Sequence, residues 1–144
     1  MKKNLFLLFV LLVMGLSASA HDFVVDGIYY NIYGSDVAVT YRGDYYSYTN
    51  EYSGNVTIPG VVTYNGTVYW VEGIGMSAFK DCSALTSVTM PNSISYIDIS
   101  AFENCSSLTN VIIPNSVKSI YTDAFAYCTG LTSVKIPNSV GTFS

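Results

Sequence analysis

The segment AFENCSSLTNVIIPNSVKSIYTD, residues 101–123, is repeated almost unchanged on both sides of itself. AFKDCSALTSVTMPNSISYIDIS precedes it at residues 78–100, and AFAYCTGLTSVKIPNSVGTFS follows it at residues 124–144. Equivalent positions therefore recur every 23 residues, as Phe79 and Phe102 do. A fixed period in the twenties is typical of a solenoid, in which each repeat forms one coil of chain stacked on the next.

Within one repeat, the apolar spacing divides the chain into a turn and a strand. Phe102, Cys105 and Leu108 recur at three-residue steps, which predicts a short helical turn. Val111 and Ile113 lie two residues apart just before a proline, which predicts a strand that the proline ends. We therefore expect a β-rich solenoid with a 23-residue period. Its predicted core consists of the inward repeat positions Phe79, Cys82, Leu85, Val88, Phe102, Cys105, Leu108, Val111, Phe125, Cys128, Leu131 and Val134.

The three cysteines follow the same period. Cys82, Cys105 and Cys128 should occupy one inward position in successive coils, where cysteine acts as a small buried hydrophobe. Because three is an odd number, at least one thiol stays unpaired within a monomer. Neighbouring strands lie about 4.8 Å apart, so a disulfide between two coils is also compatible with the spacing. We expect no metal site, because the one histidine, His21, lies near the N-terminus.

The consensus AFxxCxxLTxVxIPNSVxxI resembles the BspA-like leucine-rich repeat, a class found in exported and surface proteins of gut and oral anaerobic bacteria. The resemblance covers residues 78–144, where alanine, phenylalanine, cysteine, leucine and the IPNS-type turn fall in register. Met90 replaces the isoleucine found at Ile113 and Ile136, and its similar volume preserves the packing. The resemblance implies a leucine-rich repeat solenoid and a role in adhesion or other protein contacts.

The remaining sequence predicts three further parts. Asp26-Gly27 predicts a hairpin between two apolar stretches, and Asn65-Gly66 predicts a second one. The second hairpin interrupts a weak copy of the repeat, which should cover the open face of the first full coil. The expected divisions are a signal peptide at 1–20, an N-terminal antiparallel β module at 21–55, a degenerate first repeat with an inserted hairpin at 56–77, and the leucine-rich repeats, the last of them incomplete, at 78–144.

The first twenty residues predict export. A basic start, an apolar run from Leu5 to Leu16 and a small-residue end at Ala18-Ser19-Ala20 are typical of a cleaved secretory signal. The protein is therefore expected to be secreted or held at the cell surface, with no transmembrane anchor after signal removal. The mature chain would carry four basic and ten acidic residues, a net charge of −6. That balance argues against nucleic acid as a partner, since binding to phosphates needs clustered basic groups.

Tyrosine is concentrated before the repeats, with ten of the thirteen between Tyr29 and Tyr69. These side chains are compatible with a contact surface that stacks on glycans, and equally with the half-buried faces of a small antiparallel sheet. The candidate binding residues in this region are Tyr45, Tyr46, Tyr48 and Tyr52.

The sequence contains no pattern that favours catalysis. A nucleophilic triad would have to recruit His21, beside the predicted cleavage site. We therefore expect no catalytic residues and no cofactor. The exposed candidates on the repeats are the variable positions beside the predicted strands: Thr86, Ser87, Thr89, Thr109, Asn110, Ile112, Thr132, Ser133 and Lys135.

These observations predict a non-catalytic exported leucine-rich repeat protein that mediates protein–protein interaction or adhesion at the bacterial cell surface. The expected partner is an extracellular or host protein. One alternative is a glycan-binding surface protein that uses the tyrosine-rich module, and another is a truncated scaffold fragment. The open edge of the incomplete last repeat, which ends at Ser144, also suggests self-association.

Overall fold

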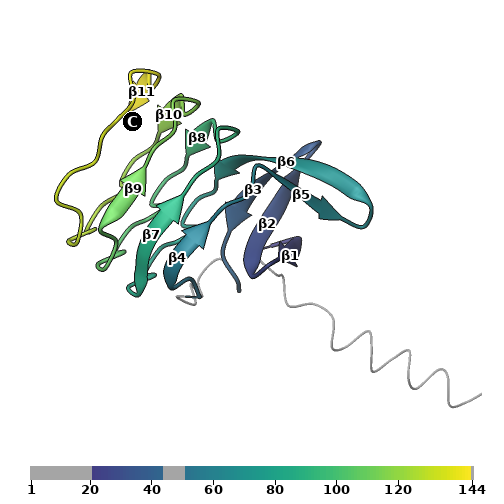
Figure 1. Ribbon diagram of the computed structural model, residues 1–144, viewed down its shortest axis with the longest axis horizontal. Helices are drawn as coiled ribbons and strands as arrows, with labels where there is room; N and C mark the ends of the chain where they lie inside the picture. The colour runs from purple at the N-terminus through teal and green to yellow at the C-terminus, as the bar shows by residue number, and fades with distance from the viewer. Residues whose placement is uncertain (1–20, 44–50, 144) are drawn as a thin grey trace, which may run out of the picture.

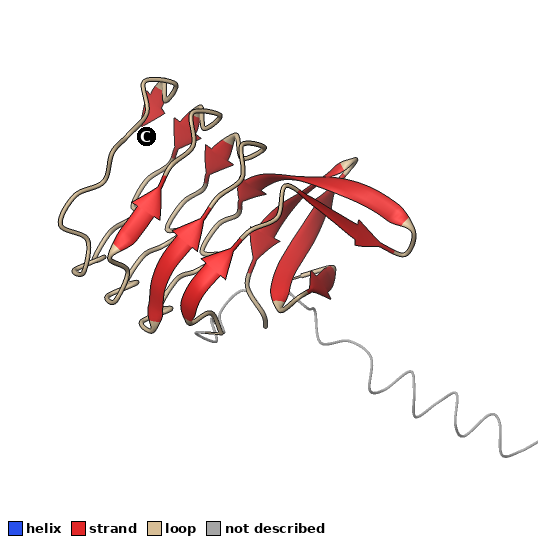
Figure 2. Ribbon diagram, viewed as in Figure 1, coloured by secondary structure: helices blue, strands red, loops and turns tan. Residues whose placement is uncertain are grey.

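The computed structural model describes residues 21–43 and 51–143, which form eleven strands and no helix (Figure 2). The strands are β1 (Phe23–Val25), β2 (Ile28–Tyr33), β3 (Asp36–Thr40), β4 (Gly54–Thr57), β5 (Val61–Tyr64), β6 (Thr67–Ile74), β7 (Leu85–Thr89), β8 (Tyr96–Ile97), β9 (Asn110–Ile112), β10 (Ser119–Ile120) and β11 (Thr142–Phe143). The repeats stack side by side as coils, named here the first (78–100), second (101–123) and third (124–143) (Figure 1).

The strands form two sheets around one hydrophobic core. The smaller sheet has the order β4-β7-β9, and the larger sheet has the order β1-β2-β3-β6-β8-β10-β11, with β5 paired to β6. The first two coils each contribute one strand to each sheet, and equivalent strands pair in parallel. Val88 lies beside Val111 in the smaller sheet, and Ile97 lies beside Ile120 in the larger one. The 23-residue period therefore places equivalent side chains in columns across both sheets.

The predicted helical turn around Phe102 is wrong. The segment forms consecutive tight turns, in which the Cys105 amide donates to the Phe102 carbonyl and the Leu108 amide donates to the Cys105 carbonyl. Ser100 and Asn104 have φ angles of 53° and 63°, in the left-handed region that a right-handed helix excludes. The Phe102 amide donates instead to Ala124 of the next coil over 2.8 Å. Hydrogen bonding between coils therefore replaces hydrogen bonding along a helix.

The core contains a column of stacked rings. The Phe79 and Phe102 ring centroids lie 4.8 Å apart with an interplanar angle of 4°, and those of Phe102 and Phe125 lie 5.1 Å apart with an angle of 2°. Nine of the twelve predicted core residues are buried, whereas Phe125, Leu131 and Val134 are only partly buried. These three belong to the third coil, over which no further coil packs within the described chain.

A column of cysteines runs beside the rings. Cys82, Cys105 and Cys128 are all buried and unpaired. The Cys105 thiol donates to the Phe79 carbonyl and the Cys128 thiol donates to the Phe102 carbonyl, each over 3.0 Å. Burial raises the pKa of the Cys82 thiol to about 12. Hydrogen bonding to the Cys128 thiol, together with burial, also raises the pKa of Cys105. Cys82 and Cys105 therefore stay protonated at neutral pH, whereas the hydrogen bond with Cys105 lowers the pKa of Cys128.

The weak copy of the repeat before Ala78 joins both sheets. Val56 in β4 lies beside Val88, and Ile74 at the end of β6 lies beside Ile97. Between these two pairings the chain forms the β5–β6 hairpin, with Asn65 at its turn, which extends away from the coils in Figure 1. The inserted residues therefore leave the register of the stack unchanged.

The N-terminal strands cover the open edge of the weak repeat copy, where β3 pairs with β6, and Tyr52 packs on the first coil. β1 and β2 form the expected hairpin at Asp26-Gly27, and β3 joins them to β6 in parallel. Tyr52 completes this cover: its ring lies 4.6 Å from that of Phe79, and its hydroxyl donates to the Thr40 carbonyl over 2.7 Å and accepts from the Tyr29 amide. Tyr52 thus ends the column of stacked rings with a ring tilted by 46° against Phe79.

Candidate interaction surface

The outward side chains of β4, β7 and β9 form one continuous surface, which we call the small-sheet face. In these strands Val56, Val88 and Val111 pack toward the core, so the residues on either side of each valine point outward. The strand pairing aligns the outward residues in two rows, which are Thr57–Thr89–Ile112 and Asn55–Ser87–Asn110. The face is therefore built by the lateral pairing of β4, β7 and β9, which lie side by side in Figure 1, with one residue from each strand in every row.

Hydrogen bonds hold part of the small-sheet face in place. The Asn55 side-chain oxygen accepts from the Thr86 hydroxyl over 2.9 Å and from the Ser87 hydroxyl over 2.8 Å. The Thr109 hydroxyl donates to the Thr86 carbonyl over 3.3 Å. Ile112, with 69% of its surface exposed, is the large apolar side chain of the face. The surface thus offers ordered hydroxyl and amide groups around one apolar centre.

The smaller sheet ends at β9, although the third coil repeats the strand sequence. Residues 131–136 form no strand, and no backbone hydrogen bond joins them to β9 in the described chain. The third coil departs only after Gly130, where an added Cβ would lie 2.7 Å from the Ser106 carbonyl oxygen. It returns at Gly141, whose amide donates to the Lys118 carbonyl over 3.0 Å. One edge of β9 is consequently open.

An open groove of about 430 Å³ lies along this edge. Ile112 and Lys135 stand on opposite sides of it, one from β9 and one from the displaced third coil. Its lining residues are Met90, Asn92, Val111, Ile112, Ile113, Pro114, Asn115, Lys135 and Pro137. The groove therefore combines apolar walls with an unpaired strand edge.

The repeat candidates from the sequence fall into two groups in the structure. Thr86, Thr89, Thr109, Asn110 and Ile112 are exposed on the small-sheet face, and Ser87 is half-buried there. Thr132, Ser133 and Lys135 are exposed on the displaced part of the third coil, away from the sheet. Asn55 and Thr57 belong to the same face and were missed. The weak copy of the repeat that begins near Val56 is the signal that could have found them.

The tyrosine candidates are not brought together as a surface. Tyr52 was expected to be exposed, and this is wrong, because it is 4% exposed and packs against Phe79. Burial raises its pKa far above the usual value for tyrosine. Tyr45, Tyr46 and Tyr48 lie outside the described residues. Tyr52 is therefore a core residue, and its hydroxyl has a structural role.

Residues 21–43 and 51–143 show no cluster suited to a metal ion. No group of three or more histidine, cysteine, aspartate or glutamate side chains in this part of the chain is arranged to hold a metal ion. His21 contacts the Tyr29 ring at 4.6 Å, and burial together with the charge of Arg42 lowers its pKa. The described segments also contain no helix that is long and apolar enough to cross a membrane.

The stacked parallel strands, the coil period and the ring and cysteine columns define a leucine-rich repeat protein. A family model described as a BspA type leucine rich repeat region matches residues 45–144. The chain belongs to this family, which confirms the resemblance seen in the repeats. No curated protein matches the sequence.

Several solved structures are similar to this chain over most of its length. A leucine-rich repeat protein from Bacteroides ovatus is 36% identical, with a TM-score of 0.75, and the match covers 85% of this chain and 31% of that protein. One from Bacteroides capillosus is 30% identical, with a TM-score of 0.72 and coverage of 85% and 86%. A leucine rich cell surface protein from Faecalibacterium prausnitzii is 28% identical, with a TM-score of 0.66 and coverage of 82% and 31%.

The chain spans about a third of the B. ovatus and F. prausnitzii proteins. The shared part is the stacked β-rich fold described above. Leucine-rich repeat families are generally non-catalytic and supply scaffolds for protein interaction. The class of protein therefore agrees with a surface built from regular rows of side chains rather than with a reaction centre.

Proposed function

We propose that this protein is an exported, non-catalytic leucine-rich repeat protein that binds another protein through the small-sheet face at the bacterial cell surface. The observation that carries the proposal is the position of Ile112. Ile112 is exposed in the Thr57–Thr89–Ile112 row of the small-sheet face and also lines the adjoining groove. An exposed apolar side chain that a partner can bury is typical of the centre of a protein interface.

The open edge of β9 supplies a way to hold such a partner. An extended segment placed in the groove would pair with the unpaired backbone of β9, as in β-strand addition. Its alternate side chains would then contact Ile112 on one side and the displaced residues near Lys135 on the other. Backbone pairing would give affinity, and the side chains of the groove would give selectivity.

The proposed location follows from the N-terminal sequence and from a relative. Residues 1–20 combine a basic start, an apolar run and a small-residue end, which are typical of a secretory signal. The similar F. prausnitzii protein is described as a cell surface protein. An extracellular or host protein is therefore the proposed partner, and adhesion the proposed outcome.

The test is a binding screen with the chain from His21 onward, which contains every described strand. Folded protein is applied to arrays of extracellular-matrix proteins and of glycans, and each hit is measured by biolayer interferometry. Ile112→Lys should weaken a true protein hit by about tenfold or more, because it places a charge at the anchor. Val24→Lys is the matched control, since Val24 is 49% exposed on β1.

Equal weakening by both variants, or binding that Ile112→Lys leaves unchanged, would contradict the role of the small-sheet face. Hits confined to the glycan array would favour the glycan alternative. A second copy of the chain is the other partner that an open β9 edge admits. Light scattering over a range of concentrations measures it, and a mass that stays monomeric at high concentration excludes self-association.

A further inference from the structure

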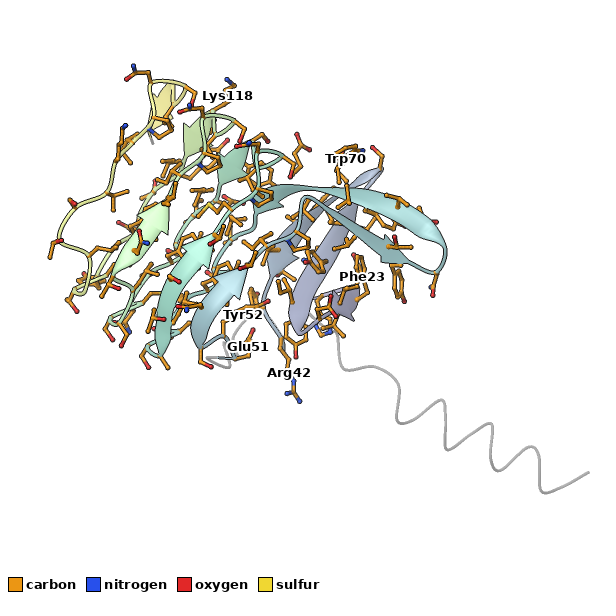
Figure 3. All side chains as sticks on the ribbon, viewed as in Figure 1. Phe23, Arg42, Glu51, Tyr52, Trp70 and Lys118 are labelled. Carbon is orange, nitrogen blue, oxygen red and sulfur yellow. The ribbon has the colours of Figure 1, made fainter. Side chains whose placement is uncertain are left out.

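The outer face of the larger sheet carries a row of exposed aromatic and apolar side chains. Tyr33 pairs with Asp36, Asp36 pairs with Trp70, and Trp70 pairs with Val61, so these four side chains share one face across β2, β3, β6 and β5. Tyr33 is 61% exposed, Trp70 59% and Val61 43%. Figure 3 shows Trp70 on the opposite side of β6 from Phe23 and the core. No described element covers this row.

A second row extends the same face toward the coils. Ala38 pairs with Gly73, and Gly73 pairs with Tyr96 of β8. The Tyr96 ring lies directly over Gly73, since an added Cβ there would come within 2.0 Å of the ring. Glycine is therefore required so that the ring can lie across the strand. The ring of Tyr96 widens the aromatic surface begun by Tyr33 and Trp70.

Carboxylates surround these rings. Burial raises the pKa of Tyr96 to about 12, with further contributions from Tyr33, Asp98, Glu72 and Tyr121, so these groups lie near its hydroxyl. The Glu72 carboxylate accepts from the Ser95 hydroxyl over 3.2 Å.

None of the nearby carboxylates of Asp36, Glu72 and Asp98 forms a salt bridge in the described chain. Lys118, which directly precedes β10, forms no ion pair with them in the described chain. We call this surface, made of Tyr33, Asp36, Val61, Trp70, Glu72, Tyr96 and Asp98, the aromatic–acidic face.

We propose that the aromatic–acidic face binds a lysine- or arginine-rich segment of a partner protein. The aromatic faces attract a cation through the ring quadrupole, and tryptophan does so most strongly. The carboxylates without a salt bridge supply the opposite charge, and the net charge of −6 expected for the mature chain steers a cation toward the protein. An acidic partner would meet repulsion at the same carboxylates. This surface is separate from the small-sheet face. An experiment that contradicts binding at one of the two faces therefore leaves the proposal for the other face untouched.

A neutral glycan would also stack on the rings, but it gains nothing from charge. The test therefore compares a cation with a neutral group of the same shape. The probe is an octapeptide with one central trimethyllysine and flanking lysines. The comparison probe carries the uncharged tert-butyl isostere at that position and alanine at the flanks, and a neutral hexasaccharide is the third probe.

Trp70 makes the measurement specific, because it is the one tryptophan of the chain. Emission from tryptophan excited at wavelengths where tyrosine does not absorb reports on the aromatic–acidic face alone. The cationic peptide should change Trp70 emission with a dissociation constant that rises with salt. The neutral isostere should bind about tenfold or more weakly.

Matched variants separate local from global charge. Asp36→Asn with Glu72→Gln should weaken the cationic peptide by about two- to tenfold. Asp26→Asn with Asp81→Asn changes the net charge equally at distant sites and should leave binding nearly unchanged. Trp70→Phe keeps a ring and should retain peptide binding measured by calorimetry, whereas Trp70→Ala should lose most of that binding. Ile112→Lys lies on the small-sheet face and should have no effect on peptide binding.

Three results would overturn the proposal. The first is equal affinity for the charged and neutral peptides. The second is a change in Trp70 emission with the hexasaccharide alone, which would assign the face to glycans. The third is no response to any probe at millimolar concentration from protein whose circular dichroism spectrum shows that it is folded.

Discussion

The second and third coils have nearly the same sequence but different environments. Leu108 of the second coil is fully buried, because β7 lies on one side of its coil and the third coil on the other. Leu131 occupies the equivalent position of the third coil and is only partly buried. The same comparison holds for Phe102 and Phe125. A repeat residue therefore contributes to stability according to its neighbours on both sides, not according to its identity alone.

The N-terminal module shows how the opposite side of the stack is covered. Tyr52 lies against Phe79 in the place that another phenylalanine ring would occupy in a longer stack. Its hydroxyl, which phenylalanine lacks, bonds to the backbone of β2 and β3. The first coil is thus covered by the weak repeat copy together with Tyr52, whereas the third coil remains partly open.

The largest expected effect is a difference between two leucine substitutions. Leu108→Ala should lower the free energy of unfolding by about 2 to 5 kcal/mol, because it leaves a cavity in a fully packed site. Leu131→Ala should cost about 1 kcal/mol or less, because its site is already partly open to water. Urea denaturation followed by circular dichroism measures both. Equal losses would show that the third coil is as well packed as the second.

A smaller effect is expected where the N-terminal module meets the first coil. Tyr52→Phe keeps the ring but removes the hydroxyl that joins Tyr29 to Thr40, which should lower the free energy of unfolding by about 1 to 3 kcal/mol. Tyr127→Phe is the control, since Tyr127 is 73% exposed and should change stability by less than about 0.5 kcal/mol. A neutral result at Tyr52 would mean that only ring packing matters there.

Cysteine labelling should rank the coils by local opening. Cys105 is fully buried with a raised pKa, whereas Cys128 of the third coil is 8% exposed. Iodoacetamide at pH 8 should therefore modify Cys128 first, about tenfold faster than Cys105, as expected when one part of a fold opens more readily. Mass spectrometry of digested protein gives the order. Simultaneous modification of both thiols would indicate that the stack opens as a single unit.

The pKa of Cys82 gives this comparison a pH dependence. Because the pKa is raised to about 12 in the folded chain, the folded state keeps its proton where the unfolded thiol has lost it. Stability contributed by this group is therefore complete below the ordinary thiol pKa of about 8.5 and is lost as pH rises from there toward 12. Cys82→Ala should remove the part of the fall in the free energy of unfolding at alkaline pH that this thiol causes.

The smallest effect is expected at the ion pair between the first two coils. The Lys80 ammonium lies 2.8 Å from the Glu103 carboxylate, and hydrogen bonding from Lys80 lowers the pKa of Glu103. Both side chains are partly exposed, so Lys80→Met should cost no more than about 1 kcal/mol. The folding stability that this ion pair contributes should disappear as pH falls below the ordinary glutamate pKa, because Glu103 then becomes protonated. Thermal unfolding at pH 7 and at pH 3 checks the difference between wild type and variant.

Part of this structure could be predicted from the sequence because stacking repeats its own spacing. The 23-residue period alone predicts that Phe79, Phe102 and Phe125 lie in one column, and their rings are stacked there. The conformation around Phe102 could not be predicted correctly, because the Phe102 and Asn104 amides bond to Ala124 and Ala126 of the next coil, each 22 residues away in the sequence. A three-residue apolar spacing is expected both for a helical turn and for a series of tight turns bonded to the next coil.

The candidate surfaces divide in the same way. Thr86, Thr89 and Ile112 could be assigned to an exposed face because their neighbours recur at core positions. The groove beside β9 could not, since LTSVKIP of the third coil is almost identical to LTSVTMP of the first, which forms a strand. The sequence also could not distinguish Tyr52, which lies in the core, from the other tyrosines of the same region.

The repeat period, the inward positions and the family can be recognised from the residue spacing, because each coil must bury the same residues against the next. Which coil is fully packed, which strand edge stays open and which distant aromatic residues share a face depend instead on how the strands pair. Tyr33, Trp70 and Tyr96 meet because β2, β3, β6 and β8 pair laterally in one sheet. Lateral pairing depends on contacts between segments far apart in the chain, and the local spacing of residues does not predict those contacts.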